Sequence, residues 1–117
     1  MDPDEFFSGE GMSFENFLSR LYRLKEFDKE VHRVIMKSKK PLRCEMVKKK
    51  VDRDTVAVYR SLQKLVKAGL CIKDRKPLKA GGHFMEYSGV SYDDARDPLM
   101  EKMDLWYKEC KSIIENR

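Results

Sequence analysis

The sequence predicts a single, mainly α-helical domain of 117 residues that carries one small β-hairpin. The first observation behind this expectation is a basic amphipathic helix at residues 54–68. The second is a pair of strand-like runs at 70–75 and 83–88, joined by a turn that contains Gly81 and Gly82. The third is the helical spacing of apolar residues on both sides of these elements, which predicts extra N- and C-terminal helices.

The basic helix has two faces of different chemistry. Val58, Leu62 and Leu65 recur at i, i+4 and i+7, which predicts a face buried in the core. The opposite arc carries Arg53, Val56, Ala57, Arg60, Gln63, Lys64 and Lys67. Gly69 suits the left-handed conformation that ends many helices, so the helix should stop there. A helix with this outer face, followed by a basic hairpin, is the layout of a winged helix-turn-helix.

Three helices are expected before the basic helix. Ser13 is the predicted N-cap of the first. Asp28 is the predicted N-cap of the second, which should end before Pro41 because a proline disfavours helix in the preceding residue. A short helix should follow over roughly residues 43–50. The chain then divides into a mobile acidic tail at 1–12, a winged helix-turn-helix with its preceding helix at 13–90, and a C-terminal helix at 91–117.

The C-terminal segment predicts a helix with a wide apolar stripe. Ser91 resembles the start of a capping box, and Pro98 either interrupts this helix or restarts it with Asp97 as N-cap. A stripe this wide must be buried, either on the chain's own N-terminal helix or, as we favour, in a two-fold dimer. The predicted dimer residues are Leu99, Met103, Trp106, Tyr107, Cys110, Ile113 and Ile114.

Charge is distributed very unevenly along the chain. Residues 31–90 carry sixteen Lys/Arg and five Asp/Glu, a net charge of +11, whereas residues 1–30 carry −4 and residues 91–117 carry −2. A basic surface of this kind favours a polyanion, and double-stranded DNA is the leading candidate. The predicted DNA-binding residues are Arg53, Thr55, Ala57, Arg60, Gln63, Lys64, Lys67, Arg75, Lys76 and Lys79, with His83 as a further possibility at the hairpin.

Catalytic, metal and cofactor chemistry is not expected. The two histidines and three cysteines are scattered without metal-ligand spacing, and no arrangement of nucleophile and base stands out. Cys44 precedes a basic stretch, which would favour a depressed pKa and redox sensing; an inert thiol is the favoured alternative. No apolar run is long enough for a membrane span, and the acidic N-terminus is unlike a signal peptide. We expect a cytoplasmic protein.

The segment from Val51 to Leu70 resembles archaeal winged-helix transcriptional regulators of the TrmB/MarR-like type, especially short members without an effector domain. The resemblance extends from about Asp28 to the end of the chain. It implies a dimeric regulator whose third core helix enters the major groove. The family usually has a Ser-Thr pair where this chain has Val56 and Ala57. These side chains would either contact thymine methyl groups or leave the phosphate contact to Thr55.

A winged helix can also serve as a protein-interaction module in a transcription or processing complex, because a fold does not fix a function. The basic outer face and the full-length hairpin favour DNA over this alternative. RNA is a weaker possibility, because no aromatic stacking platform is apparent on a sheet. The sequence gives no indication of a small-molecule effector.

Overall fold

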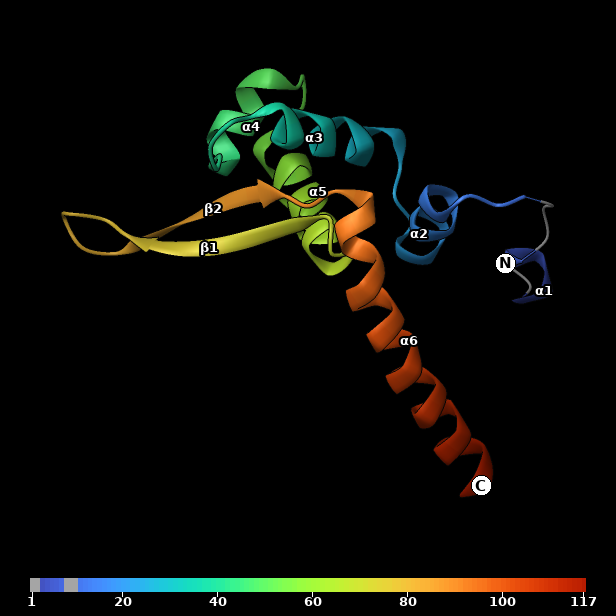
Figure 1. Cartoon of the computed structure of the whole chain (residues 1–117). Helices are drawn as coiled ribbons and strands as arrows, with labels where there is room; N and C mark the ends of the chain where they lie inside the picture. The colour runs from blue at the N-terminus through green and yellow to red at the C-terminus, as the bar shows by residue number, and fades with distance from the viewer. Residues whose placement is uncertain (1–2, 8–10) are drawn as a thin grey trace.

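The computed structural model describes residues 3–7 and 11–117, and it has the predicted mainly helical fold with one antiparallel hairpin (Figure 1). The elements are α1 (Pro3–Phe6), α2 (Phe14–Tyr22), α3 (Glu26–Lys37), α4 (Cys44–Lys50), α5 (Thr55–Lys67), β1 (Cys71–Pro77), β2 (His83–Gly89) and α6 (Tyr92–Glu115). Helices α3, α4 and α5 form the body, the hairpin extends from it, and α6 projects away from it (Figure 1). This order is that of a winged helix-turn-helix.

Leu42, between α3 and α4, pairs with the edge of the hairpin as an isolated β-bridge. Leu42 bridges Tyr87 of β2, with a Leu42 N–H to Tyr87 oxygen distance of 3.0 Å and a Tyr87 N–H to Leu42 oxygen distance of 2.8 Å. Both side chains are buried. The base of the hairpin is therefore attached to the helical body by backbone hydrogen bonds as well as by packing.

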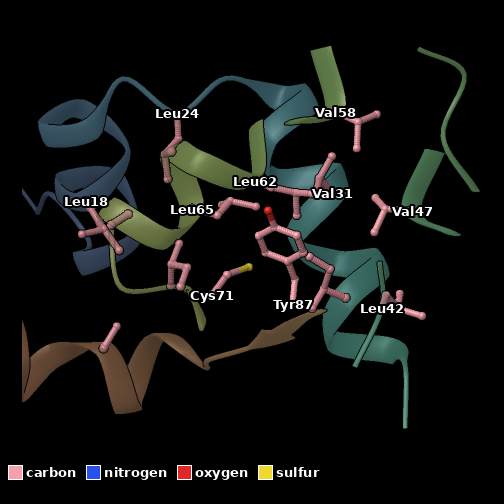
Figure 2. Close-up of a cluster of buried hydrophobic side chains, with 14 of the residues drawn as sticks. Leu18, Leu24, Val31, Leu42, Val47, Val58, Leu62, Leu65, Cys71 and Tyr87 are labelled. Carbon is pink, nitrogen blue, oxygen red and sulfur yellow. The ribbon is translucent and has the colours of Figure 1, made fainter. Parts of the chain in front are cut away.

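The core lies between α5, α3 and the base of the hairpin (Figure 2). Val58, Leu62 and Leu65 of α5 are completely buried, which confirms the predicted inner face of this helix. Tyr87 enters the same cluster from β2, and Val31 enters it from α3 (Figure 2). Burying a side chain of this size stabilises the fold by about 1.5–3 kcal/mol, so this face determines the orientation of α5.

Local hydrogen bonds define most helix ends as the sequence predicts. The Ser13 hydroxyl accepts a hydrogen bond from Asn16 N–H at 3.1 Å, and the Ser91 hydroxyl accepts one from Asp94 N–H at 3.1 Å. Asp54 caps α5 by accepting from Ala57 N–H at 2.7 Å. Gly69 follows α5 with a φ of 78°, the left-handed conformation that a residue with a side chain rarely adopts.

Two predicted helix boundaries are wrong. Helix α3 begins at Glu26, and Asp28 lies inside its first turn, where its carboxylate accepts a hydrogen bond from Lys25 N–H at 2.8 Å. Asp28 therefore caps the helix from within. Helix α6 runs through Pro98 without interruption or restart. The buried Ala95 and Leu99 hold this helix against the body on both sides of the proline.

The N-terminal segment is only partly described. Residues 1–2 and 8–10 of the predicted mobile tail lie outside the described residues, and its mobility stays a prediction. Within the described part, the Phe6 ring centroid lies 5.7 Å from that of Phe17 in α2. The Arg20 guanidinium also donates a hydrogen bond to the Phe6 carbonyl oxygen at 3.1 Å. Helix α1 thus packs against α2 of its own chain.

Helix α6 divides into a packed part and an exposed part. Tyr92 lies edge-on to Phe14 of α2, with ring centroids 6.4 Å apart, and to His32 of α3, with ring centroids 5.4 Å apart. The ring contact between α6 and the chain's own α2 thus lies at the first turn of α6. From Met100 to the C-terminus every residue is exposed, and the helix leaves the body (Figure 1).

Candidate nucleic-acid interface

The outer face of α5 is open to solvent along its length. Arg60, Gln63 and Lys67 are exposed, and Val56 and Tyr59 expose 57% and 47% of their surface. The buried inner face holds the helix in place, so these side chains project from a fixed backbone. Arg60 lies near the middle of this face, with Val56 one turn before it.

The start of α5 carries a further positioned cation. The Arg53 guanidinium lies over the Phe27 ring, 4.6 Å from its centroid, and cation–π attraction favours this arrangement. Arg53, Ala57 and Arg60 line one hollow beside the start of α3. Thr55 is exposed next to it, and Ala57 is half-buried. The predicted residues at this end of the helix therefore lie close together.

Lys64 has a different environment from the one its sequence position predicts. Its ammonium lies 2.9 Å from the Asp28 carboxylate and donates to the Arg23 carbonyl oxygen at 3.1 Å. Burial alone would raise the pKa of Asp28, but the Lys25 N–H and the Lys64 ammonium outweigh it and lower that pKa. Lys64 therefore connects α5 to the α2–α3 junction, and its charge is already paired within the chain.

The hairpin has two faces, and the predicted basic residues are divided between them. Cross-strand partners share a face, so Lys73 and Arg75 lie on the side of the buried Tyr87. Lys76 belongs to the opposite face, where its ammonium pairs with Asp74 at 3.2 Å. Lys79 is exposed in the turn. Arg75 and Lys76 therefore project from opposite faces of the hairpin, although they are adjacent in sequence.

A hollow of about 440 Å³ separates the second half of α5 from β1. Its lining residues are Arg60, Gln63, Lys64, Val66, Lys67 and Lys73, which include four cations and no carboxylate. The sequence-based prediction did not include Lys73. Side chains two residues apart on a strand share a face, so Lys73 lies on the same face as the buried Cys71. This spacing was the signal for Lys73 in the sequence.

The pKa values of Cys44 and Cys71 are raised. Burial, with a smaller contribution from Glu45, raises the pKa of Cys44, which contradicts the depressed pKa considered for redox sensing. Burial raises the pKa of Cys71 to about 12. Cys110 is exposed on α6. Within residues 3–7 and 11–117, no group of three or more His, Cys, Asp or Glu side chains has the arrangement of a metal site.

The predicted dimer residues lie on one side of α6, and all but one of them are exposed to solvent. Met103, Trp106, Tyr107, Cys110, Ile113 and Ile114 are exposed. Leu99 instead lies in the core of its own chain with 5% exposure. Successive residues are about 100° apart on a helix, so the exposed members and Met100 share an arc of roughly 140°.

In the described part of the chain, no helix has the length and apolar character needed to cross a membrane.

Comparisons with known proteins support the fold. No family model matches the chain. An uncharacterized protein from Methanocaldococcus jannaschii is 23% identical over 103 residues, covering 88% of this chain and 77% of that protein. A possible transcriptional regulator from Methanosarcina mazei has a TM-score of 0.62 at 17% identity, covering 90% of this chain and 88% of its own. A protein from the archaeon Sulfolobus tokodaii has a TM-score of 0.52 at 20% identity, covering 89% and 96%. At these identities the two structures establish a shared fold.

Proposed function

We propose that the protein is a cytoplasmic transcriptional regulator of the TrmB/MarR-like type that binds double-stranded DNA as a homodimer. The observation that carries this proposal is the exposed, cation-bearing face of α5 beside a basic hairpin. In this arrangement α5 enters the major groove, and the hairpin lies on the phosphate backbone or in the minor groove. The description of the Methanosarcina mazei protein as a possible transcriptional regulator agrees with this function.

The side chains of α5 have distinct proposed roles. Arg60, at the centre of the exposed face, is suited to bidentate recognition of guanine, which discriminates by about 1–3 kcal/mol against other bases. Val56 and Ala57 are suited to contact with thymine methyl groups, and Thr55 to a phosphate. Gln63, Lys67, Arg53, Arg75 and Lys79 would bind the backbone. Lys64 and Lys76 are left out of this set, because each already has an acidic partner.

A second copy of the chain is the proposed partner of α6. The exposed apolar arc runs over about four turns from Met100 to Ile114, and residues 3–7 and 11–117 leave it uncovered. The remaining arc carries mostly charged side chains, with Leu105 among them, so one side of the helix favours burial more than the other. Two such helices would cover each other about a two-fold axis. The two α5 helices would then address half-sites one helical turn, or a multiple of it, apart.

A protein-interaction module is the alternative function. It is favoured by Val56 and Tyr59, two large, exposed and largely apolar side chains on an otherwise basic face. Such a module would bind duplex DNA only through nonspecific charge attraction. The two functions therefore differ in how binding depends on base sequence and on salt.

Fluorescence anisotropy separates these functions. The titrations would use a duplex from upstream of the chain's own gene and a scrambled duplex, each at low and moderate salt. If each protomer neutralises about five phosphates, log K should fall against log[salt] with a slope of roughly −9 for the dimer. Arg60→Ala should remove the preference for the upstream duplex, whereas Lys79→Ala should weaken both duplexes alike and flatten the slope. Weak, sequence-independent binding that disappears with salt would reject the proposed regulator.

A further inference from the structure

We propose that the hollow between α5 and β1 is a phosphate-binding site in which Lys73 holds the DNA backbone. This inference rests on the proposed DNA-binding function and adds a residue and a site to it. The ligand is a phosphodiester group of the duplex, and Lys73 acts together with Lys67 and Gln63 from the facing helix. Arg60 borders the same hollow, so the site is continuous with the proposed base-reading residue.

The register of the hairpin places Lys73 in this site. Lys73 pairs with Tyr87, whose side chain is buried, so both residues are on the side of the sheet that faces the helices. Lys76 is on the other side and is paired with Asp74. Lys73, near the base of the hairpin, therefore faces α5, whereas Lys76, further along β1, faces away from it.

The charges in this hollow are available for an external anion. Among the described residues, Arg60, Lys67 and Lys73 form no ion pair, whereas Lys64 is held by Asp28. Lysines that face one another across a hollow without carboxylates repel each other, and a bound phosphate relieves this repulsion. The Gln63 side chain can add a neutral hydrogen-bond donor.

Helix α6 improves the electrostatics of the site. The C-terminal end of a helix carries a partial negative charge, which would oppose a nearby phosphate. The Lys102 ammonium of α6 donates a hydrogen bond to the Lys67 carbonyl oxygen at 3.4 Å, at this end of α5. It therefore offsets the negative helix end and adds a positive charge beside the hollow.

Lys73→Gln tests the site, with Lys108→Gln on the charged side of α6 as the matched control. Lys73→Gln removes one phosphate contact per protomer, so the salt slope of the dimer should become less steep by about 1.8. Affinity at 0.15 M salt should fall roughly 10- to 30-fold for both the upstream and the scrambled duplex. Lys108→Gln should retain the wild-type slope. Because both lysines are exposed, circular dichroism melting should be the same for both variants and wild type.

The outcomes separate this site from the function on which it rests. If the wild-type chain binds neither duplex, the proposed DNA-binding function fails. If wild type binds but Lys73→Gln retains its slope and affinity, the DNA function stands and the phosphate site is wrong. Inorganic phosphate, titrated in a thermal-shift assay, distinguishes the source of the anion. Stabilisation by phosphate that Lys73→Gln abolishes, with an unchanged DNA slope, would assign the hollow to a free phosphate and overturn the DNA contact.

Discussion

Helices α5 and α6 are both amphipathic, but the described residues cover the apolar face of α5 along its length and that of α6 only at its first turns. The apolar face of α5 is buried against α3 and the hairpin, and its polar face is left to solvent. The apolar face of α6 is buried only near Ala95 and Leu99, and its later turns expose Trp106 and Ile113. For the apolar arc that the described residues leave uncovered we propose an intermolecular partner, and for the polar arc with unpaired cations we propose an anion.

From this difference we propose separate tasks for the two helices. Helix α5 is held in one orientation by its own domain, which suits the proposed DNA-reading role. Helix α6 would bring two domains together and so set the distance between two α5 helices. The hydrogen bond from Lys102 to the Lys67 carbonyl oxygen joins the two helices where they meet. Substitutions on the exposed arc of α6 should therefore change dimer dissociation, whereas substitutions on α5 should change stability or DNA binding.

The largest effect is expected from Trp106→Ala, on the exposed arc of α6. Loss of an interface aromatic costs about 2 kcal/mol per protomer, so the dimer should dissociate roughly 1000-fold more readily. Sedimentation velocity over a concentration series measures this shift. Leu105→Ala is the control, because Leu105 exposes 61% of its surface, against 41% for Trp106, but lies on the charged side of the helix. An equal shift for both variants would contradict the assigned interface.

The next effect concerns the covered face of α5. Leu62→Ala should destabilise the fold by about 3 kcal/mol, because it leaves a cavity in a completely buried cluster. Gln63→Ala, one residue further along, should change the free energy of unfolding by less than about 0.5 kcal/mol. Urea denaturation of both variants measures the difference. Similar values for the two would mean that α5 is not oriented as described.

A smaller effect is expected at the ion pair between α3 and α5. The folded-state pKa of Asp28 is lowered, so its contribution to stability is present above its unfolded pKa of about 3.9 and is lost as pH falls through the folded value. Asp28→Asn should cost about 1–2 kcal/mol at neutral pH, a reduced figure because Lys64 is partly exposed and screened. The variant should also lose less stability on acidification than wild type. A parallel acid dependence of the two proteins would show that Asp28 contributes nothing.

The smallest perturbation is chemical labelling of the three thiols. With a thiol reagent at neutral pH, Cys110 should react first, and Cys71, which is buried with a pKa of about 12, should react only on unfolding. If a second copy covers α6, Cys110 should react faster on dilution and faster still in Trp106→Ala. A Cys110 rate that is independent of protein concentration would argue against cover by a second chain.

Local interactions made much of the fold predictable, and distant contacts account for what was missed. Ser13, Ser91 and Gly69 act within one helix turn, so their roles follow from nearby sequence. The ion pair of Lys64 was not predicted, because its partner Asp28 lies 36 residues away and no helical pattern reveals that contact. Leu99 belongs to the predicted stripe, but only the tertiary structure shows that the body covers it. The strand alternation could have identified Lys73.

Sedimentation equilibrium of the chain with a fluorescent upstream duplex tests the central claim most directly, because it reports partner and stoichiometry together. We predict a complex of two chains per duplex, and a free protein of twice the 13.9 kDa chain mass. Trp106→Ala should give a 13.9 kDa free protein that binds the duplex more weakly. A wild-type protein that sediments as a monomer and leaves the duplex unbound would contradict both the covered α6 helix and the DNA-reading α5 helix.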